Sequence, residues 1–126
     1  MSDKYNKGLE NFRTLFGDAH TERELEQVTD FDRDFHRVLM EYCFDEVWSG
    51  KGLSWKQKSL NNLCMLAVMN RPAQFETHFR GALRNGCTLD ELRDTLIQIT
   101  VYAGIPVGAE AFRIAKKVLK EEGIIQ

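Results

Sequence analysis

The sequence has few of the residues that form covalent or metal cross-links. Among its 126 residues it has only three cysteines, Cys43, Cys64 and Cys87, and they form neither a CxxC pair nor a Cys/His zinc spacing. An odd number of cysteines is typical of free thiols in a reducing compartment. A disulfide framework and a structural metal site are therefore not expected.

An excess of basic charge and a long apolar run are missing as well. The net charge is -2 and the Lys and Arg residues are dispersed, so nucleic acid is not expected as a partner. No apolar run approaches the roughly 20 residues that cross a bilayer, so a membrane is not expected either. The first residues, MSDKYNKGLENF, lack the apolar segment of a secretion signal. These features together predict a cytoplasmic protein.

The composition that is present suits one folded domain. Hydrophobic residues make up 43% of the chain and charged residues 29%, and the length predicts a single domain over residues 1–126. Apolar residues recur at intervals of three and four without sustained alternation, which indicates helices. The sequence therefore predicts a compact all-α domain of six or seven helices with short connections.

In the first part of the chain, a helix is expected from about Tyr5 to Leu15, ending at Gly17. Thr21 or Thr29 is expected to cap the next helical segment. That segment carries an apolar stripe, predicted as its buried face, that consists of Phe31, Phe35, Val38, Leu39 and Tyr42. His36 lies one residue off this stripe and is predicted to face solvent. Residues 49–54, SGKGLS, are predicted to form a turn.

The second part of the chain contains clear helix start and stop signals. An apolar helix over about 56–69, predicted to be largely surrounded by protein, is broken by NRP at 70–72. The following helix ends at Asn85 and Gly86. Thr88 and Glu91 have the spacing of a capping box, which predicts a helix that runs to Gly104. A last helix is expected over about 107–122.

Histidines are the main candidates for chemistry, because the chain has no G-x-S-x-G elbow, phosphate loop, HExxH motif or metal-ligand set. No metal or organic cofactor is therefore expected. His78 falls among Phe75, Phe79 and Ala82, on the predicted buried face of its helix. Periodicity alone leaves two possibilities open for His78: a structural histidine bonded to backbone, or an acid/base group beside a cavity.

Four segments give a more specific indication: GLENFRTLFGDAH at 8–20, DFHRVLMEYCFDEVWSGKGLS at 34–54, HFRGALRNGCTLDELRDTLIQITVYAGIPVG at 78–108 and AFRIAKKVL at 111–119. Together, and in this order, they resemble the gamma-carboxymuconolactone decarboxylase family over nearly the whole chain. The resemblance implies an alkylhydroperoxidase D-like helical fold, assembled as a homohexamer with sites near subunit contacts. It also implies conversion of gamma-carboxymuconolactone to the β-ketoadipate enol-lactone and CO2 in aromatic catabolism, without a cofactor.

Within this resemblance three residues are expected to be catalytic. His78 would protonate the dienolate formed when CO2 leaves, or hydrogen-bond its oxygen. Lys58, at the start of the apolar helix where the family commonly has Arg, would anchor a substrate carboxylate. Glu46, in the EVW segment, would orient a histidine or a lysine, and a solvated helix end is its alternative role.

Three further residues are expected to bind substrate. His20 and Arg13 belong to the R-x-x-x-G-D-x-H segment of the decarboxylase branch and would close the site from a neighbouring subunit. Arg80 lies roughly 200 degrees around the helix from His78, so a subunit contact is its alternative role. Tyr102 is expected to pack in the protein interior.

Two departures from the family pattern bear on the substrate. Lys56 and Lys58 stand where an R-x-R pair is common, and lysine keeps the charge but loses the bidentate fork of arginine. Ala109 and Glu110 stand where a polar Asn or His is common, and a carboxylate would repel a dianionic substrate unless it is protonated or turned away.

Two other functions are compatible with the fold. A thiol-dependent peroxidase like alkylhydroperoxidase D has C-x-x-C-x-x-x-H, but this chain has Arg71 and Gln74 at the cysteine positions. The second alternative is a non-catalytic protein that binds a small acid.

Overall fold

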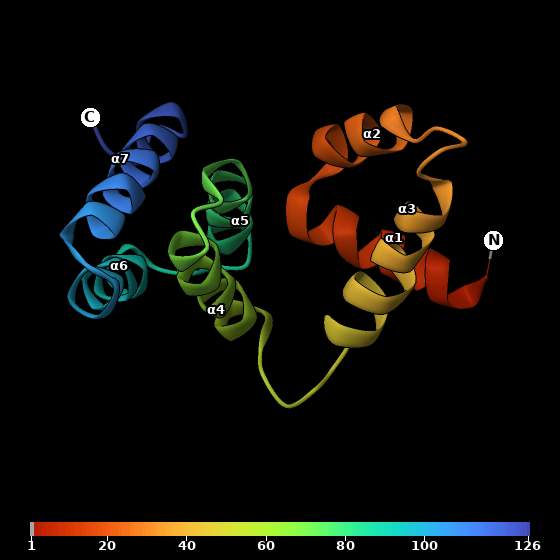
Figure 1. The fold of residues 1–126 in the computed structure, drawn as a ribbon, viewed down its shortest axis with the longest axis horizontal. Coiled ribbons are helices and arrows are strands. Elements are labelled where there is room, and N and C mark those ends of the chain that lie inside the picture. Colours follow the sequence, from red (N-terminus) through yellow and green to blue (C-terminus); the bar gives the residue numbers. More distant parts are fainter. Residues whose placement is uncertain (1) are drawn as a thin grey trace. The chain divides into compact units, whose positions relative to one another are not determined.

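A computed structural model describes residues 2–126 and shows only helices and their connections in that range (Figure 1). The predicted all-α class is confirmed, with seven α-helices and one π-helix over these residues. Contacts divide the chain into two compact units, of which the first ends at Ser54 and the second begins at Trp55. The single domain over residues 1–126 stays a prediction. No helix within 2–126 is both long and apolar enough to cross a membrane.

The first unit contains α1 (Asp3–Phe16), α2 (Asp18–Gln27), α3 (Arg33–Val38) and the π-helix η1 (Leu39–Val47), which continues α3. Helix α1 packs mainly along η1. Helix α1 ends at Gly17, whose φ of 90° lies in a region that favours glycine, so the predicted stop is confirmed.

The predicted caps of the next helices are wrong. Gly17 is the N-cap of α2, and Thr21 lies inside that helix, where its hydroxyl donates to the Gly17 carbonyl at 2.7 Å. Asp32 is the N-cap of α3, and its carboxylate accepts bonds from the backbone and hydroxyl of Thr29. The sequence pattern missed both positions because a glycine and an aspartate serve as caps as readily as a threonine.

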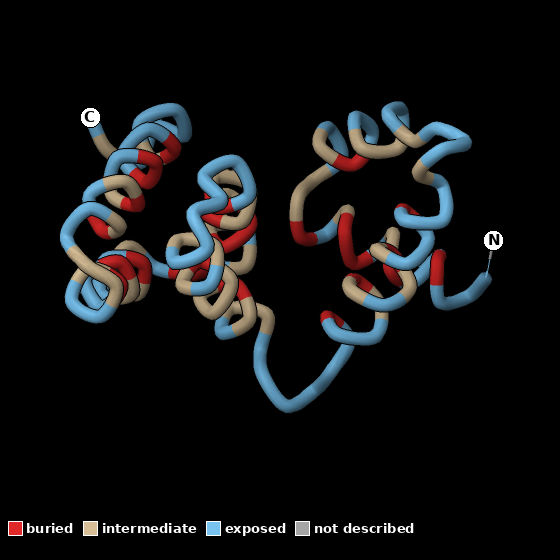
Figure 2. Tube along the Cα trace, viewed as in Figure 1, coloured by how far each residue is buried: buried red, intermediate tan, exposed pale blue. Residues whose placement is uncertain are grey.

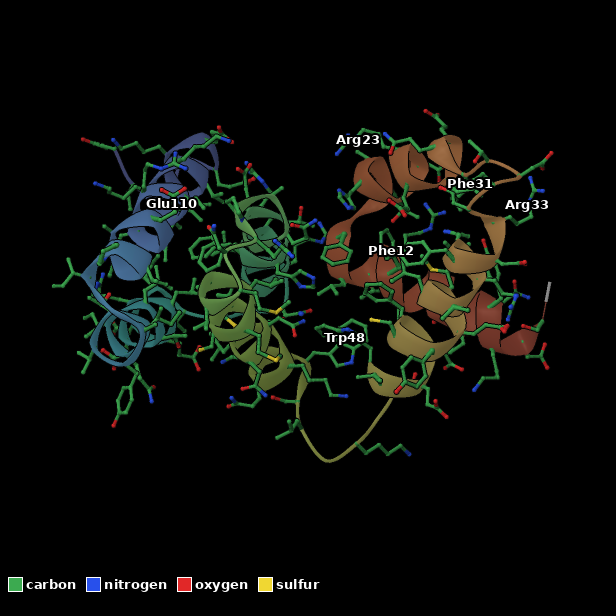
Figure 3. All side chains as sticks on the ribbon, in the orientation of Figure 1. Phe12, Arg23, Phe31, Arg33, Trp48 and Glu110 are labelled. Atoms are coloured by element: carbon green, nitrogen blue, oxygen red, sulfur yellow. The ribbon has the colours of Figure 1, made fainter. Side chains whose placement is uncertain are left out.

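The predicted buried stripe of residues 31–42 is also wrong. The buried side chains follow a spacing of four and are His36, Met40, Phe44 and Trp48. Phe31, at the turn before α3 (Figure 3), is 99% exposed, and Phe35 and Tyr42 are exposed too. The prediction that His36 faces solvent is wrong as well, because a histidine with a hydrogen-bond partner can face a core.

His36 has such a partner in α1. Its Nε2 lies 2.8 Å from the hydroxyl of Tyr5, both side chains are buried, and its Nδ1 has no protein partner within residues 2–126.

Replacing Tyr5 with phenylalanine would leave His36 Nε2 without this bond. We expect Tyr5→Phe to lower the free energy of unfolding by about 1–3 kcal/mol in urea denaturation. Tyr42→Phe, at an exposed tyrosine of η1, is the matched control; equal stability of the two variants would contradict this prediction.

The second unit consists of α4 (Trp55–Val68), α5 (Pro72–Arg84), α6 (Leu89–Ala103) and α7 (Ile105–Glu121). Its core is apolar and includes Leu63, Phe75, Phe79, Leu96 and Val118. Buried positions occur on all four helices (Figure 2, red). The predicted local signals are confirmed. Pro72 starts α5, and the capping box of α6 is formed by Glu91 N–H donating to Thr88 Oγ1 and Thr88 N–H donating to the Glu91 carboxylate.

Two expectations about burial in this unit are wrong. Helix α4 is less surrounded than predicted: Ser59 and Leu63 are buried, whereas Met65 and Val68 are more than half exposed. Tyr102, expected to pack, is 85% exposed. A helix that is apolar on all sides is expected to pack against other helices on all sides. The pattern does not show whether those helices belong to the same chain.

Candidate active site

His78 lies on helix α5 and is half-buried, and its helix also carries the core residues Phe75 and Phe79. Its Nδ1 lies 3.5 Å from the side-chain nitrogen of Asn62 on the neighbouring helix α4. Asn62 is not among the site residues predicted from the sequence. The available signal was a polar amide within the apolar run SLNNLCMLAV, where a half-buried side chain needs a hydrogen-bond partner.

Lys58 lies on α4 four residues before Asn62 and is half-buried. Residues four apart share one face of a helix, so Lys58 and Asn62 point to the same side of α4. Asn62 thus contacts the predicted acid/base residue and shares a helix face with the predicted carboxylate anchor. The second unit therefore supplies a histidine and a lysine on two adjacent helices.

Glu46, the third predicted catalytic residue, belongs to the first unit. It is exposed in the last turn of η1. Its role in orienting His78 or Lys58 stays a prediction.

Arg13 has two carboxylate partners within the first unit. Its guanidinium lies 2.9 Å from Glu22 and 3.1 Å from Asp18, and the hydrogen bonds that it donates to these two carboxylates raise the pKa of Arg13 further above its ordinary value. These pairs join the end of α1 to α2. A role of Arg13 in binding substrate stays a prediction.

His20 packs in an aromatic cluster of the same unit. Its ring stacks on Phe12 with centroids 5.6 Å apart and lies 5.2 Å from Phe16. Burial, and to a smaller extent the positive charge of Arg23, lowers the pKa of His20 below its ordinary value of 6.5. The ring is therefore mainly neutral near pH 7, and its role in substrate binding stays a prediction.

Arg80 is the centre of an ion-pair cluster between α5 and the end of α7. It contacts Glu76 at 3.0 Å, Glu121 at 2.5 Å and Glu122 at 3.0 Å, while Lys117 contacts Glu76 at 2.8 Å. This arrangement favours a role in holding the two helices together. The predicted role in substrate binding stays untested.

The cluster predicts a pH dependence of stability. Hydrogen bonds from Lys117 and Arg80 lower the pKa of Glu76 below its ordinary value of 4.5. The stabilisation is therefore present above about pH 4.5 and is lost as the pH falls through the lower pKa of the folded state. We expect the Tm of the wild type to fall more than that of Glu76→Gln between pH 6 and pH 3 in calorimetry. Parallel pH profiles of Tm would contradict this expectation.

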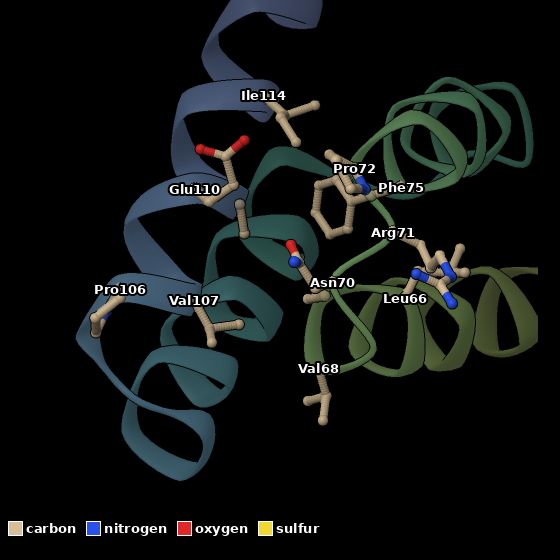
Figure 4. A pocket seen from close by; sticks show the side chains of 12 residues that line it. Leu66, Val68, Asn70, Arg71, Pro72, Phe75, Pro106, Val107, Glu110 and Ile114 are labelled. Carbon is tan, nitrogen blue, oxygen red and sulfur yellow. The ribbon is translucent and has the colours of Figure 1, made fainter.

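A pocket of about 210 Å³ lies between the α4–α5 turn and α7 (Figure 4). Its wall is mostly apolar, with Phe75, Val107 and Ile114, and includes Glu110; His78 is not a lining residue. Hydrogen bonds from Arg113, at 2.9 and 2.5 Å, lower the pKa of Glu110, so this carboxylate is charged and paired. Glu110 therefore faces a pocket whose lining does not include the candidate catalytic histidine.

A second and larger hollow, of about 740 Å³, lies between α4 and α6. Its lining mixes apolar side chains with polar ones, and the polar residues are Gln57, Asn61, Thr95, Gln98 and Tyr102. Lys58 and His78 are not among the lining residues. Within residues 2–126, no three His, Cys, Asp or Glu side chains form a group that could hold a metal ion.

The three cysteines are unpaired, as predicted. Burial raises the pKa of each thiol above its ordinary value. A smaller fraction of each thiol is therefore ionised near neutral pH, and the thiolate is the form that attacks peroxides and disulfides.

Comparison with known proteins gives the class of the enzyme. The chain is 34% identical over 121 residues, covering 96% of this chain and 90% of the relative, to a 4-carboxymuconolactone decarboxylase of Acinetobacter baylyi. It is 28% identical over 117 residues, 93% of this chain and 82% of the relative, to a nitrosuccinic acid decarboxylase of Metarhizium robertsii. The protein is an enzyme of the carboxy-lyase class.

The family of this protein follows from a match between its sequence and a family model. The model of the carboxymuconolactone decarboxylase family matches residues 33–117, and the chain belongs to this family. The matched range contains Glu46, Lys58, His78 and Arg80, whereas Arg13 and His20 precede it. An uncharacterized 15.0 kDa protein of Paracoccus denitrificans is 29% identical over 86 residues, which cover 67% of this chain and 64% of that protein.

Proposed function

We propose that the protein decarboxylates gamma-carboxymuconolactone, or a closely related lactone acid, to the enol-lactone and CO2. One observation carries this proposal: His78 contacts Asn62, which shares a face of α4 with Lys58, inside the matched family range. The 34% identity to the Acinetobacter baylyi decarboxylase supports the choice of substrate.

The proposed substrate needs no cofactor as an electron acceptor. When the bond to the carboxylate breaks, its electron pair moves through the ring double bond into the lactone carbonyl, and a dienolate forms. A proton is then added to the carbon beside that carbonyl. The protein has to hold the carboxylates, stabilise the dienolate oxygen and permit this protonation.

The candidate residues suit these tasks. The ammonium group of Lys58 would hold a carboxylate through a charge-assisted hydrogen bond. The His78 imidazole would act at the dienolate, as a hydrogen-bond donor or as a proton donor. Glu46 would orient one of these two groups, and Arg13, His20 and Arg80 would assist binding, as the family resemblance implies.

Nitrosuccinic acid is a second candidate substrate, which the 28% identity to the Metarhizium robertsii decarboxylase favours. Its nitro group accepts the electron pair when the carboxylate on the same carbon leaves, so this acid also carries its own electron acceptor. The second carboxylate would be held by Lys58 in the same way.

The test is an assay of the purified protein with each acid, monitoring CO2 and the product. Turnover of the lactone supports the first assignment, and turnover of nitrosuccinate alone supports the second. Turnover of neither acid by folded protein would overturn the proposal and favour the non-catalytic acid-binding alternative. A thiol peroxidase is disfavoured by Arg71 and Gln74 at the CxxC positions and by the raised thiol pKa values.

Lys58 gives a sharper prediction within this assay. Lys58→Ala is expected to raise KM roughly 10- to 150-fold, because a charge-assisted hydrogen bond to a carboxylate contributes about 1.5–3 kcal/mol. Lys58→Arg keeps the charge and should restore most of the affinity. An unchanged KM in Lys58→Ala would remove this residue from the site.

The proposal includes a homo-oligomer, a hexamer by family resemblance, that acts in the cytoplasm in the β-ketoadipate pathway. The exposed apolar side chains of α3 and η1 support association, since a second copy would remove them from water. Sedimentation of the purified protein tests this part, and a monomer at working concentrations would contradict it.

A further inference from the structure

The side chain of Asn62 on α4 contacts the ring of His78 on α5. We infer that Asn62 is a positioning residue that keeps His78 neutral with its proton on Nε2, so that His78 acts as a hydrogen-bond donor to the developing oxyanion. The inference rests on the proposed function for its consequence in catalysis. The predicted tautomer of His78 does not depend on the identity of any substrate.

The geometry between α4 and α5 carries the inference. The side-chain nitrogen of Asn62 lies 3.5 Å from Nδ1 of His78. An amide nitrogen only donates hydrogen bonds, so the ring nitrogen that faces it has to accept. A neutral imidazole with an accepting Nδ1 carries its proton on Nε2.

The polar residues of α4 indicate that this contact is specific. Ser59 accepts a bond from Asn85 at 2.8 Å, and Gln57 donates to Asn61 at 2.8 Å. Each of these side chains has a protein partner, and Asn62 has His78. Asparagine forms helices less readily than the leucines around it, and a half-buried amide without a partner costs free energy. The contact with His78 offsets this cost.

The same contact disfavours the charged form of His78. Protonation of Nδ1 would place its N–H against the amide N–H groups of Asn62, so two donors would face each other. A neutral His78 keeps the Nε2 proton and stabilises the oxygen that receives the electron pair during loss of CO2. The carbon then takes its proton from solvent in a separate step.

The first test is the tautomer itself, measured by NMR on protein labelled with ¹⁵N-histidine at pH 8. The chain has three histidines, and His78→Gln identifies the His78 signals by their loss. The inference expects Nδ1 to be unprotonated and Nε2 to be protonated. Protonation on Nδ1 in the wild type would overturn the inference, because the amide oxygen of Asn62 would then face the ring.

The variants Asn62→Asp and Asn62→Ala test whether the side chain at position 62 decides which nitrogen of His78 carries the proton. The carboxylate of Asn62→Asp accepts from Nδ1–H, so the proton of the neutral ring is expected to move from Nε2 to Nδ1. Loss of the Nε2–H donor should lower kcat roughly 10²–10³-fold, as when one oxyanion donor is removed. Asn62→Ala should leave a mixture of the two tautomers. An unchanged tautomer in Asn62→Asp would also overturn the inference.

The pH profile of the wild type distinguishes the two roles of His78. A neutral donor predicts that kcat/KM falls as the pH decreases through the pKa of His78, whereas a cationic acid predicts a fall as the pH increases through it. If neither acid is turned over, the proposed function fails, while the NMR result still decides the tautomer.

Discussion

Replacing His78 with alanine is expected to lower kcat by roughly 10²–10⁴-fold while the protein stays folded. The imidazole is the group assigned to the dienolate, and it sits half-buried beside Asn62 rather than deep in the core. Its loss therefore removes stabilisation of the transition state without opening a large cavity. The measurement is kcat with the lactone acid, with thermal unfolding as the test of folding.

Two further variants make this result specific. Gln74→Ala changes an exposed residue one turn earlier on α5 and should keep kcat within about twofold of the wild type. His78→Gln keeps an N–H donor but cannot transfer a proton, so it should retain more activity than His78→Ala. If His78→Ala were as active as Gln74→Ala, His78 would be a structural histidine.

The largest expected effect on stability comes from Gly8 in α1. A Cβ added at Gly8 would lie 1.9 Å from the backbone oxygen of Met40 in η1 and 2.6 Å from its carbonyl carbon. Backbone atoms of a packed helix cannot move aside as a flexible side chain does, so α1 and η1 would have to separate. We expect Gly8→Ala to lower the free energy of unfolding by about 3 kcal/mol, the upper part of the range for overpacked cores.

Gly52→Ala is the matched control for this substitution. A Cβ at Gly52 meets no atom within 4 Å, so its effect should stay within about 0.5 kcal/mol. Urea denaturation followed by circular dichroism measures both variants. Equal stability of Gly8→Ala and Gly52→Ala would mean that α1 and η1 do not pack as closely as the structure shows.

The helices of the second unit were largely predictable from the sequence, because local chemistry marks their ends. Pro72 suits the first turn of α5, Thr88 and Glu91 bond to each other's backbone, and Gly104 adopts a φ of 113° that other residues avoid. Each signal acts within a few residues of the chain. It therefore holds whatever the rest of the protein does.

The candidate site was predictable only in part. His78 and Lys58 were identified through the family resemblance, and both fall in the range that the family model matches. Asn62 was missed because its role depends on a contact with a residue 16 positions away on another helix. Arg80 likewise takes its partners Glu121 and Glu122 from 41 and 42 positions further along the chain.

The sequence by itself determined the helical class, most helix boundaries and the family, since these depend on local backbone preferences and on ordered motifs. Only the tertiary structure decided which face of residues 31–48 is buried, because two neighbouring stripes fit the same helical period. The bond between Tyr5 and His36 joins residues 31 positions apart and lets a polar ring face the core. Pairing of this kind depends on how distant helices pack, and no local pattern encodes it.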